Sequence, residues 1–112
     1  MDGPVRTRAC VLFGALANPT RLEIVELLLE GERSVGDVAA AVRIGQSGAS
    51  QHLSHLARAG VIVATRRGST RLYRVRGPRI TQIMSTIEEF CQIHGLYGQG
   101  PDEEPEVLDA MS

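Results

Sequence analysis

The stretch that decides the fold runs from residue 45 to residue 62 and reads GQSGASQHLSHLARAGVI. Small polar residues dominate it. Its apolar residues Ala49, Leu53 and Leu56 recur at intervals of three and four, which is the spacing of one helix face. The pattern predicts an amphipathic helix that is capped by Ser47 or its neighbour and stops at Gly60. After Gly60 a run of β-branched residues predicts a strand.

Three helices are predicted before this one. The first covers residues 5–17 and the second residues 19–30; Pro19 begins the second because proline is tolerated in a first turn but not inside a helix. Ser34 is the expected N-cap of a short third helix, and Gly45 makes the turn to the fourth. Two short helices joined by a glycine-containing turn form a helix-turn-helix.

A β-hairpin is predicted after the fourth helix, with strands at residues 61–65 and 71–75 joined by a loop that contains Gly68. A last helix is expected from Pro78 to His94. The expected fold is mainly α with a small β-hairpin: a winged helix-turn-helix of about five helices plus a wing. We expect this domain to cover residues 1–95, and residues 96–112 to form a flexible acidic tail.

Length and composition restrict the class of protein. A chain of 112 residues suits one domain, and with 4% aromatic residues its core must be mainly aliphatic. No apolar run approaches the roughly 20 residues that cross a bilayer, and no secretion signal is recognised at the N-terminus. Two cysteines without metal-ligand spacing favour reduced thiols and a cytoplasmic protein without membrane contact.

Charge is distributed unevenly along the chain. Residues 39–87 contain eight arginines and no acidic residue, whereas residues 88–112 contain seven acidic residues and no arginine or lysine. An all-basic centre beside an acidic end indicates a polyanionic partner. All basic side chains are arginine, which suits bidentate contact with phosphate or guanine.

Three stretches resemble the ArsR/SmtB family of bacterial winged-helix repressors: residues 16–22 (LANPTRL), residues 47–56 (SGASQHLSHL) and residues 59–62 (AGVI). The resemblance extends over residues 5–94. It implies a homodimer joined through the first and last helices, which places a recognition helix and a wing from each protomer on an imperfect inverted repeat of double-stranded DNA. It also implies control of its own or a neighbouring operon, altered by a metal ion or a thiol-reactive signal.

The outward face of the fourth helix is the expected base-reading surface. It is polar and free of acids, its short side chains allow close approach in the major groove, and glutamine can form two hydrogen bonds with adenine. The residues expected to contact DNA here are Gln46, Ser47, Ser50, Gln51, Ser54 and His55. For His52, a hydrogen-bonded structural role and base contact remain alternatives.

The hairpin tip is expected to act as the wing. Gly68 supplies a tight turn, and the arginines around it supply charge for the phosphate backbone or the minor groove. The expected contacts are Arg66, Arg67 and Arg71.

The signal that is sensed stays open. The helix before the recognition helix carries Ser34-Val35-Gly36-Asp37, without the thiols of the family's Cys-x-Cys-x-x-Asp site, and the last helix lacks the family's full second pattern. Cys91 and His94 share a helix face, and with Cys10 they would form a site for Ni, Zn or Co. The alternatives are joint oxidation of the two cysteines, or structural cysteines that act as small hydrophobes in a dimer interface.

Other functions fit less well. For a winged-helix protein-interaction module we would expect an acidic recognition helix, and this sequence shows the opposite. A regulator that depends on a separate sensor partner stays open, with the acidic tail as a docking segment for a co-regulator protein. No glycine-rich phosphate loop, paired carboxylates or nucleophile–base arrangement indicates an enzyme or a catalytic residue.

Overall fold

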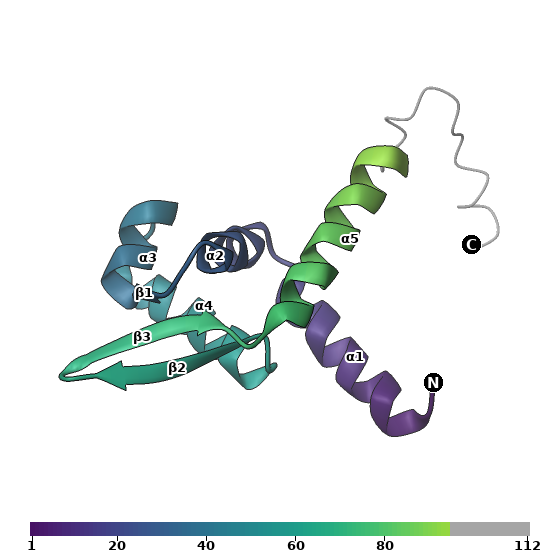
Figure 1. The fold of residues 1–112 in the computed structure, drawn as a ribbon, viewed down its shortest axis with the longest axis horizontal. Coiled ribbons are helices and arrows are strands. Elements are labelled where there is room, and N and C mark those ends of the chain that lie inside the picture. Colours follow the sequence, from purple (N-terminus) through teal and green to yellow (C-terminus); the bar gives the residue numbers. More distant parts are fainter. Residues whose placement is uncertain (95–112) are drawn as a thin grey trace. The chain divides into compact units, whose positions relative to one another are not determined.

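The computed structural model describes residues 1–94, with side chains described up to residue 92. The chain divides into two compact units, one of residues 1–80 and one that begins at Thr81. Helices and strands follow in the order α1 (Gly3–Leu16), α2 (Pro19–Leu29), β1 (Arg33–Ser34), α3 (Val35–Val42), α4 (Gln46–Arg58), β2 (Ile62–Arg67), β3 (Thr70–Val75) and α5 (Pro78–His94). The predicted fold class, mainly α with a small hairpin, is confirmed (Figure 1). The predicted tail, residues 96–112, lies outside the described residues.

Side chains at the helix N-termini explain where three of the helices begin. The Asp2 carboxylate accepts the Val5 N–H at 2.8 Å, Asn18 Oδ1 accepts the Arg21 N–H at 2.9 Å, and Ser34 Oγ accepts the Asp37 N–H at 3.1 Å. Each bond satisfies one of the amide groups that a helix start leaves without an intrahelical partner. The expectation that Ser34 caps α3 is confirmed.

The start of α4 differs from the expectation. Gly45, not Ser47, is the N-cap, and no side chain caps this helix. The Gly45 backbone is extended, with φ −69° and ψ 156°, and its carbonyl accepts the Ala49 N–H at 3.0 Å. The left-handed residue of the α3–α4 turn is Arg43, with φ 62°. The chain therefore reverses direction at an arginine, and Ser47 is left free within the first turn of α4.

The sheet is antiparallel with strand order β1-β3-β2, and its two-residue edge strand β1 was not predicted. The hairpin is longer and its turn tighter than expected: Arg67 pairs with Thr70, so only Gly68 and Ser69 form the turn. Gly68 has φ 63°, which fits the first central position of a type II′ turn and suits the twist of the strands. The hairpin therefore extends as a ribbon from the helices of its unit (Figure 1).

The core of the first unit is aliphatic and gathers around α4. Its buried residues come from the C-terminal end of α1, from α2, α3 and α4, and from the base of the hairpin, and Tyr73 is the one aromatic residue among them. The predicted inward positions of α4 are confirmed, because each is fully buried. The largest fully buried side chains are Ile24, Leu28, Leu53, Leu56, Ile62, Val25, Val38 and Val61. This packing fixes the opposite face of α4 toward solvent.

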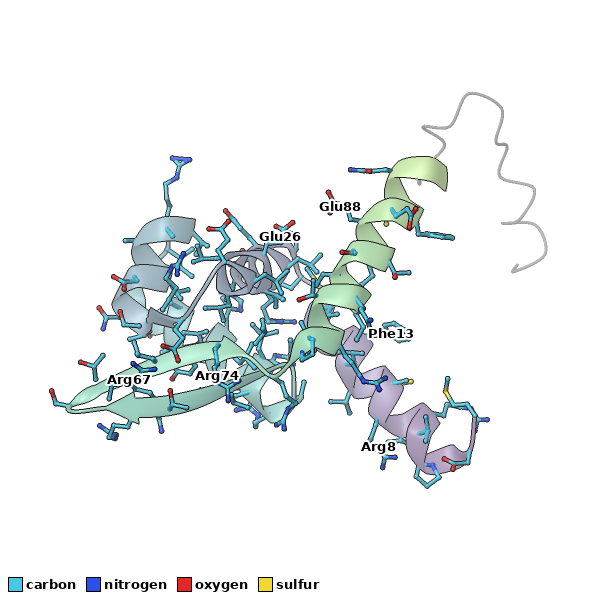
Figure 2. All side chains as sticks on the ribbon, viewed as in Figure 1. Arg8, Phe13, Glu26, Arg67, Arg74 and Glu88 are labelled. Carbon is cyan, nitrogen blue, oxygen red and sulfur yellow. The ribbon has the colours of Figure 1, made fainter. Side chains whose placement is uncertain are left out.

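Helix α1 carries large apolar side chains that the described unit leaves exposed. Phe13 is 64% exposed, Val11 50% and Val5 40%, while the buried residues of the helix lie at its C-terminal end. Figure 2 labels Phe13 on α1. The apolar residues of this helix are thus divided between a buried C-terminal end and an exposed face. Among the described residues, no helix is long and apolar enough to cross a membrane.

Candidate nucleic-acid interface

The outward face of α4 is polar, uncharged and accessible. Five of the six residues that sequence reasoning assigned to it are exposed, and His55 is half-buried. Within the described residues, the serine and glutamine side chains of this face bond to no other protein group. Their donors and acceptors are therefore free for an external partner. The residues are Gln46, Ser47, Ser50, Gln51, Ser54 and His55.

The hairpin tip concentrates positive charge on one face of the ribbon. Arg66 pairs directly with Arg71 across β2 and β3, and both are exposed. Like charges directly opposite each other on a sheet are destabilising, and no carboxylate within the described residues pairs with either one. An anion placed between them would remove this repulsion.

Arg67 differs from its two neighbours because it is already paired. Its Nη2 atom lies 3.3 Å from Glu32 Oε1, just before β1. The Arg67 side chain is 68% exposed and that of Glu32 31%, so solvent screens the pair and its energy is small. Figure 2 labels Arg67 on β2 and Arg74 on β3. The tip therefore offers two unpaired arginines and one that must leave Glu32 before it can contact a phosphate.

A basic concavity that the sequence did not reveal opens between α2 and α4. It has a volume of about 540 Å³ and is lined by Arg21, Ser50, Gln51, His52, Ser54, His55 and Arg58. We call it the basic concavity. Arg58 was detectable as a continuation of the polar face, one helical turn beyond Ser54. Arg21 was not, because it is 31 residues before His52 and only the packing of α2 on α4 joins them.

Arg21 is fixed by three contacts at the edge of the concavity. Its Nε donates to the Ala15 carbonyl at 2.6 Å, its Nη2 to the Gly14 carbonyl at 3.2 Å, and its Nη1 to His52 Nδ1 at 3.4 Å. Of the two roles left open for His52, the contact with Arg21 favours the structural one. A guanidinium group can only donate, so His52 Nδ1 is the acceptor in this contact.

His55 lies among positive groups and is held in its neutral form. Desolvation by partial burial lowers the pKa of His55, and the charges of Arg21, Arg58 and His52 lower it further. Both effects disfavour the imidazolium form. His55 therefore presents an uncharged ring to solvent at neutral pH, although an anion nearby would reverse the balance.

The two cysteines are exposed, Cys10 on α1 and Cys91 on α5, so within the described chain neither is a buried hydrophobe. The side chain of His94 lies outside the described side chains. No group of three or more potential metal-binding side chains occurs among the residues that the structure describes. The suggested set of Cys10, Cys91 and His94 therefore stays a prediction.

Comparison with known proteins places this geometry in a family. The model for bacterial regulatory proteins of the arsR family matches residues 18–63, from the N-cap of α2 to the start of β2. The transcriptional activator HlyU of Vibrio cholerae is 36% identical over 92 residues, covering 82% of this chain and 80% of HlyU. A probable mercury resistance operon repressor of Streptomyces lividans is 38% identical over 72 residues, covering 64% of this chain and 58% of that protein.

A solved structure extends the likeness to the fold. The homodimeric winged helix-turn-helix DNA-binding domain of Mb0332 from Mycobacterium bovis superposes with a TM-score of 0.78 at 28% identity, covering 92% of this chain and all of that domain. The sequence, the helix-turn-helix and the hairpin agree on one assignment. The chain belongs to the ArsR/SmtB family of bacterial transcriptional regulators and carries that family's winged helix-turn-helix DNA-binding domain.

Proposed function

We propose that the protein is a repressor that binds an imperfect inverted repeat in double-stranded DNA as a homodimer. Two observations carry the proposal: the acid-free polar face of α4, whose serine and glutamine side chains bond to no other described group, and the facing arginines of the hairpin tip. Uncharged donors and acceptors on a helix suit base edges in the major groove, and arginines on a ribbon suit phosphates. We assign base contacts to α4, and phosphate or minor-groove contacts to Arg66, Arg67 and Arg71.

The homodimer is supported by the exposed apolar face of α1. Val5, Val11 and Phe13 present side chains that a second copy would remove from water, at roughly 25 cal/mol for each Å² buried. The similar Mb0332 domain is homodimeric. We propose that α1 and α5 form the interface, and that its two-fold symmetry matches the two half-sites of an inverted repeat.

The direction of control is the least constrained part of the proposal. One relative is named an activator and another an operon repressor. We favour repression because a protein that is dimerised on a promoter excludes polymerase from the DNA it covers, and because two relatives are named repressors. In vitro transcription from the chain's own upstream promoter tests this choice: the protein should reduce the transcript, and an increase would contradict repression.

The test of DNA binding is a fluorescence anisotropy titration of that promoter fragment against a scrambled duplex of equal length. Saturable binding that prefers the promoter and weakens with salt is expected. Ser54→Ala should reduce the preference, whereas Thr20→Ala on α2, outside the surfaces assigned to DNA and to the dimer, serves as a control that also removes a hydroxyl group. Equal affinity for both duplexes would overturn sequence-specific regulation, and no binding at low salt would overturn a DNA role altogether.

We further propose that the response involves the cysteines, since both thiols are accessible. A transition metal held by Cys10, Cys91 and His94, or joint oxidation of the two thiols, would act on the helices that we assign to the dimer. Native mass spectrometry with Ni, Zn and a mild oxidant should reveal a mass increase for a metal, or the loss of two hydrogen atoms to the oxidant for a disulfide. Cys10→Ser and Cys91→Ser should each abolish it, and an unchanged mass would contradict both forms of sensing.

A further inference from the structure

The basic concavity is a place where positive charge is unbalanced. Three of its lining residues are ionisable on α4 (His52, His55 and Arg58), and Arg21 joins them from α2. Helix α4 also packs against α1, α3 and β2, but no charged residue from these elements lines the concavity. No carboxylate lies among the lining residues, so nothing in the concavity compensates the charge of the two guanidinium groups.

The charge at the edge of the concavity is fixed in position. Arg21 reaches two carbonyls at the C-terminal end of α1, Ala15 and Gly14, and the ring of His52. None of these partners is a carboxylate, so they orient the guanidinium without forming an ion pair with it. A group that is ordered before binding loses little conformational freedom on binding. The concavity therefore resembles a preformed oxyanion site, with Arg21, His55 and Arg58 among its lining residues.

His55 would make the binding of an oxyanion in the concavity depend on pH. In the free protein its surroundings oppose the imidazolium, through partial burial and through Arg21, Arg58 and His52. An oxyanion in the concavity would offset those charges and accept a hydrogen bond from the protonated ring. Occupation of the concavity and protonation of His55 thus favour each other.

We propose that the basic concavity binds a phosphate of the DNA backbone and that His55 takes up a proton as the phosphate enters. The inference rests on the proposed DNA binding and adds its regulation: affinity for DNA increases as the pH falls. An inorganic phosphate has the same chemistry. We assign the duplex as the source because the concavity is lined by Ser50, Gln51 and Ser54, the outward residues of the proposed recognition helix.

The sign follows from linkage. Above the pKa of His55 in the complex, neither state holds the proton and affinity does not depend on pH. Between that value and the lowered pKa of the free protein, the complex holds one more proton per protomer, so binding strengthens as the pH falls. Below the lower value both states are protonated and the dependence ends. One proton per protomer corresponds to a change of up to about tenfold in Kd per pH unit for each half-site.

The experiment measures the Kd of the promoter fragment by anisotropy from pH 8.5 to pH 5.5 at constant ionic strength. For the natural chain we expect the Kd to fall by about threefold to tenfold between pH 8 and pH 6. His55→Gln should remove this pH dependence. A natural chain without the dependence, or a His55→Gln variant that retains it, would overturn the inference while leaving DNA binding intact; absence of binding at every pH would instead overturn the proposed function.

Histidine NMR gives a second reading that needs no variant of His55. Addition of the duplex should raise the titration midpoint of the His55 ring, and Arg58→Gln in the free protein should also raise it, because one opposing charge is removed. A midpoint that the duplex leaves unchanged would overturn the inference. Inorganic phosphate at matched ionic strength serves as the other arm: a response to inorganic phosphate without a response to duplex would overturn DNA as the source of the phosphate.

Discussion

The face of α4 and the tip of the hairpin are both exposed and both free of acidic side chains, but they carry different chemistry. On α4 the groups are short, uncharged and held by a helix whose opposite side is fully buried. On the hairpin they are long arginines on a ribbon, two of them facing each other and a third paired with Glu32. Base edges are distinguished by hydrogen-bond pattern, whereas phosphates offer the same charge at every step. Under the proposed function, this difference predicts that specificity and affinity for DNA can be changed separately.

The largest effect is expected from removing the facing arginines. The double variant Arg66→Ala/Arg71→Ala takes four charges from a dimer, so the slope of log Kd against log salt should fall by up to about 4 and affinity should drop at least about tenfold at low salt. The loss should be equal for promoter and scrambled duplexes. Salt titrations by anisotropy measure both quantities.

The matched control for that variant is Arg6→Ala/Arg8→Ala, which removes the same charge from α1. Provided that sedimentation shows this variant to be a dimer, since α1 is assigned to the dimer interface, it should leave the salt slope close to that of the natural chain. If both double variants lowered the slope equally, net charge and not the hairpin tip would be responsible.

A smaller effect, of the opposite type, is expected on α4. Gln51→Ala removes a side chain able to form two hydrogen bonds with one base, a contact worth about 1–3 kcal/mol of discrimination. The ratio of promoter to scrambled affinity should fall about fivefold or more, with the salt slope unchanged. An equal loss of affinity for both duplexes would instead assign Gln51 to the DNA backbone. It would contradict the proposed division between base contacts on α4 and phosphate contacts on the hairpin.

The hairpin also contains a defect that α4 lacks. Thr65 Oγ1 is buried and, within the described residues, has no hydrogen-bond partner. Thr65→Val keeps the shape and removes the unsatisfied oxygen, which should raise the free energy of unfolding by about 1 kcal/mol. Thermal or urea unfolding measures it, and Thr70→Val, at an exposed position of the same hairpin, is the control. Destabilisation by Thr65→Val would indicate that the hydroxyl has a partner in solution.

The smallest effect concerns the paired arginine. Glu32→Gln should release Arg67 and strengthen DNA binding by about twofold to threefold, since an exposed ion pair is worth less than about 1 kcal/mol. In an Arg67→Ala background the same change should have no effect. Tighter binding in both backgrounds would point to general loss of negative charge, not to release of Arg67.

Local patterns were sufficient for most of the fold. The spacing of Ala49, Leu53 and Leu56 predicted the buried side of α4, and Ser34 predicted the start of α3, because these features depend on residues within one or two turns. The two-residue turn at Gly68 was missed because strand pairing extended into residues that look like a loop. The left-handed Arg43 was missed because such a conformation is commonly expected at glycine.

The sequence predicted only those parts of the candidate site that lie within a single helix or a single hairpin. The outward residues of α4 follow from the same period that gives its buried side. The basic concavity does not, because Arg21 belongs to α2 and reaches α4 only after the helices pack. The pairing of Arg67 with Glu32 likewise joins residues 35 positions apart. Contacts between residues that are distant in the sequence produce no periodic pattern, so the sequence alone could not predict them.

The exposed apolar face of α1 has a consequence for abundance. Under the proposed dimerisation, Phe13, Val11 and Val5 make the DNA-binding species depend on the square of the protomer concentration, so occupancy of a promoter rises more steeply than the amount of protein. If that promoter controls the chain's own synthesis, a small excess of protomers shuts down further production. A few aliphatic and aromatic side chains on the first helix would then determine how narrowly the concentration of the regulator in the cell is controlled.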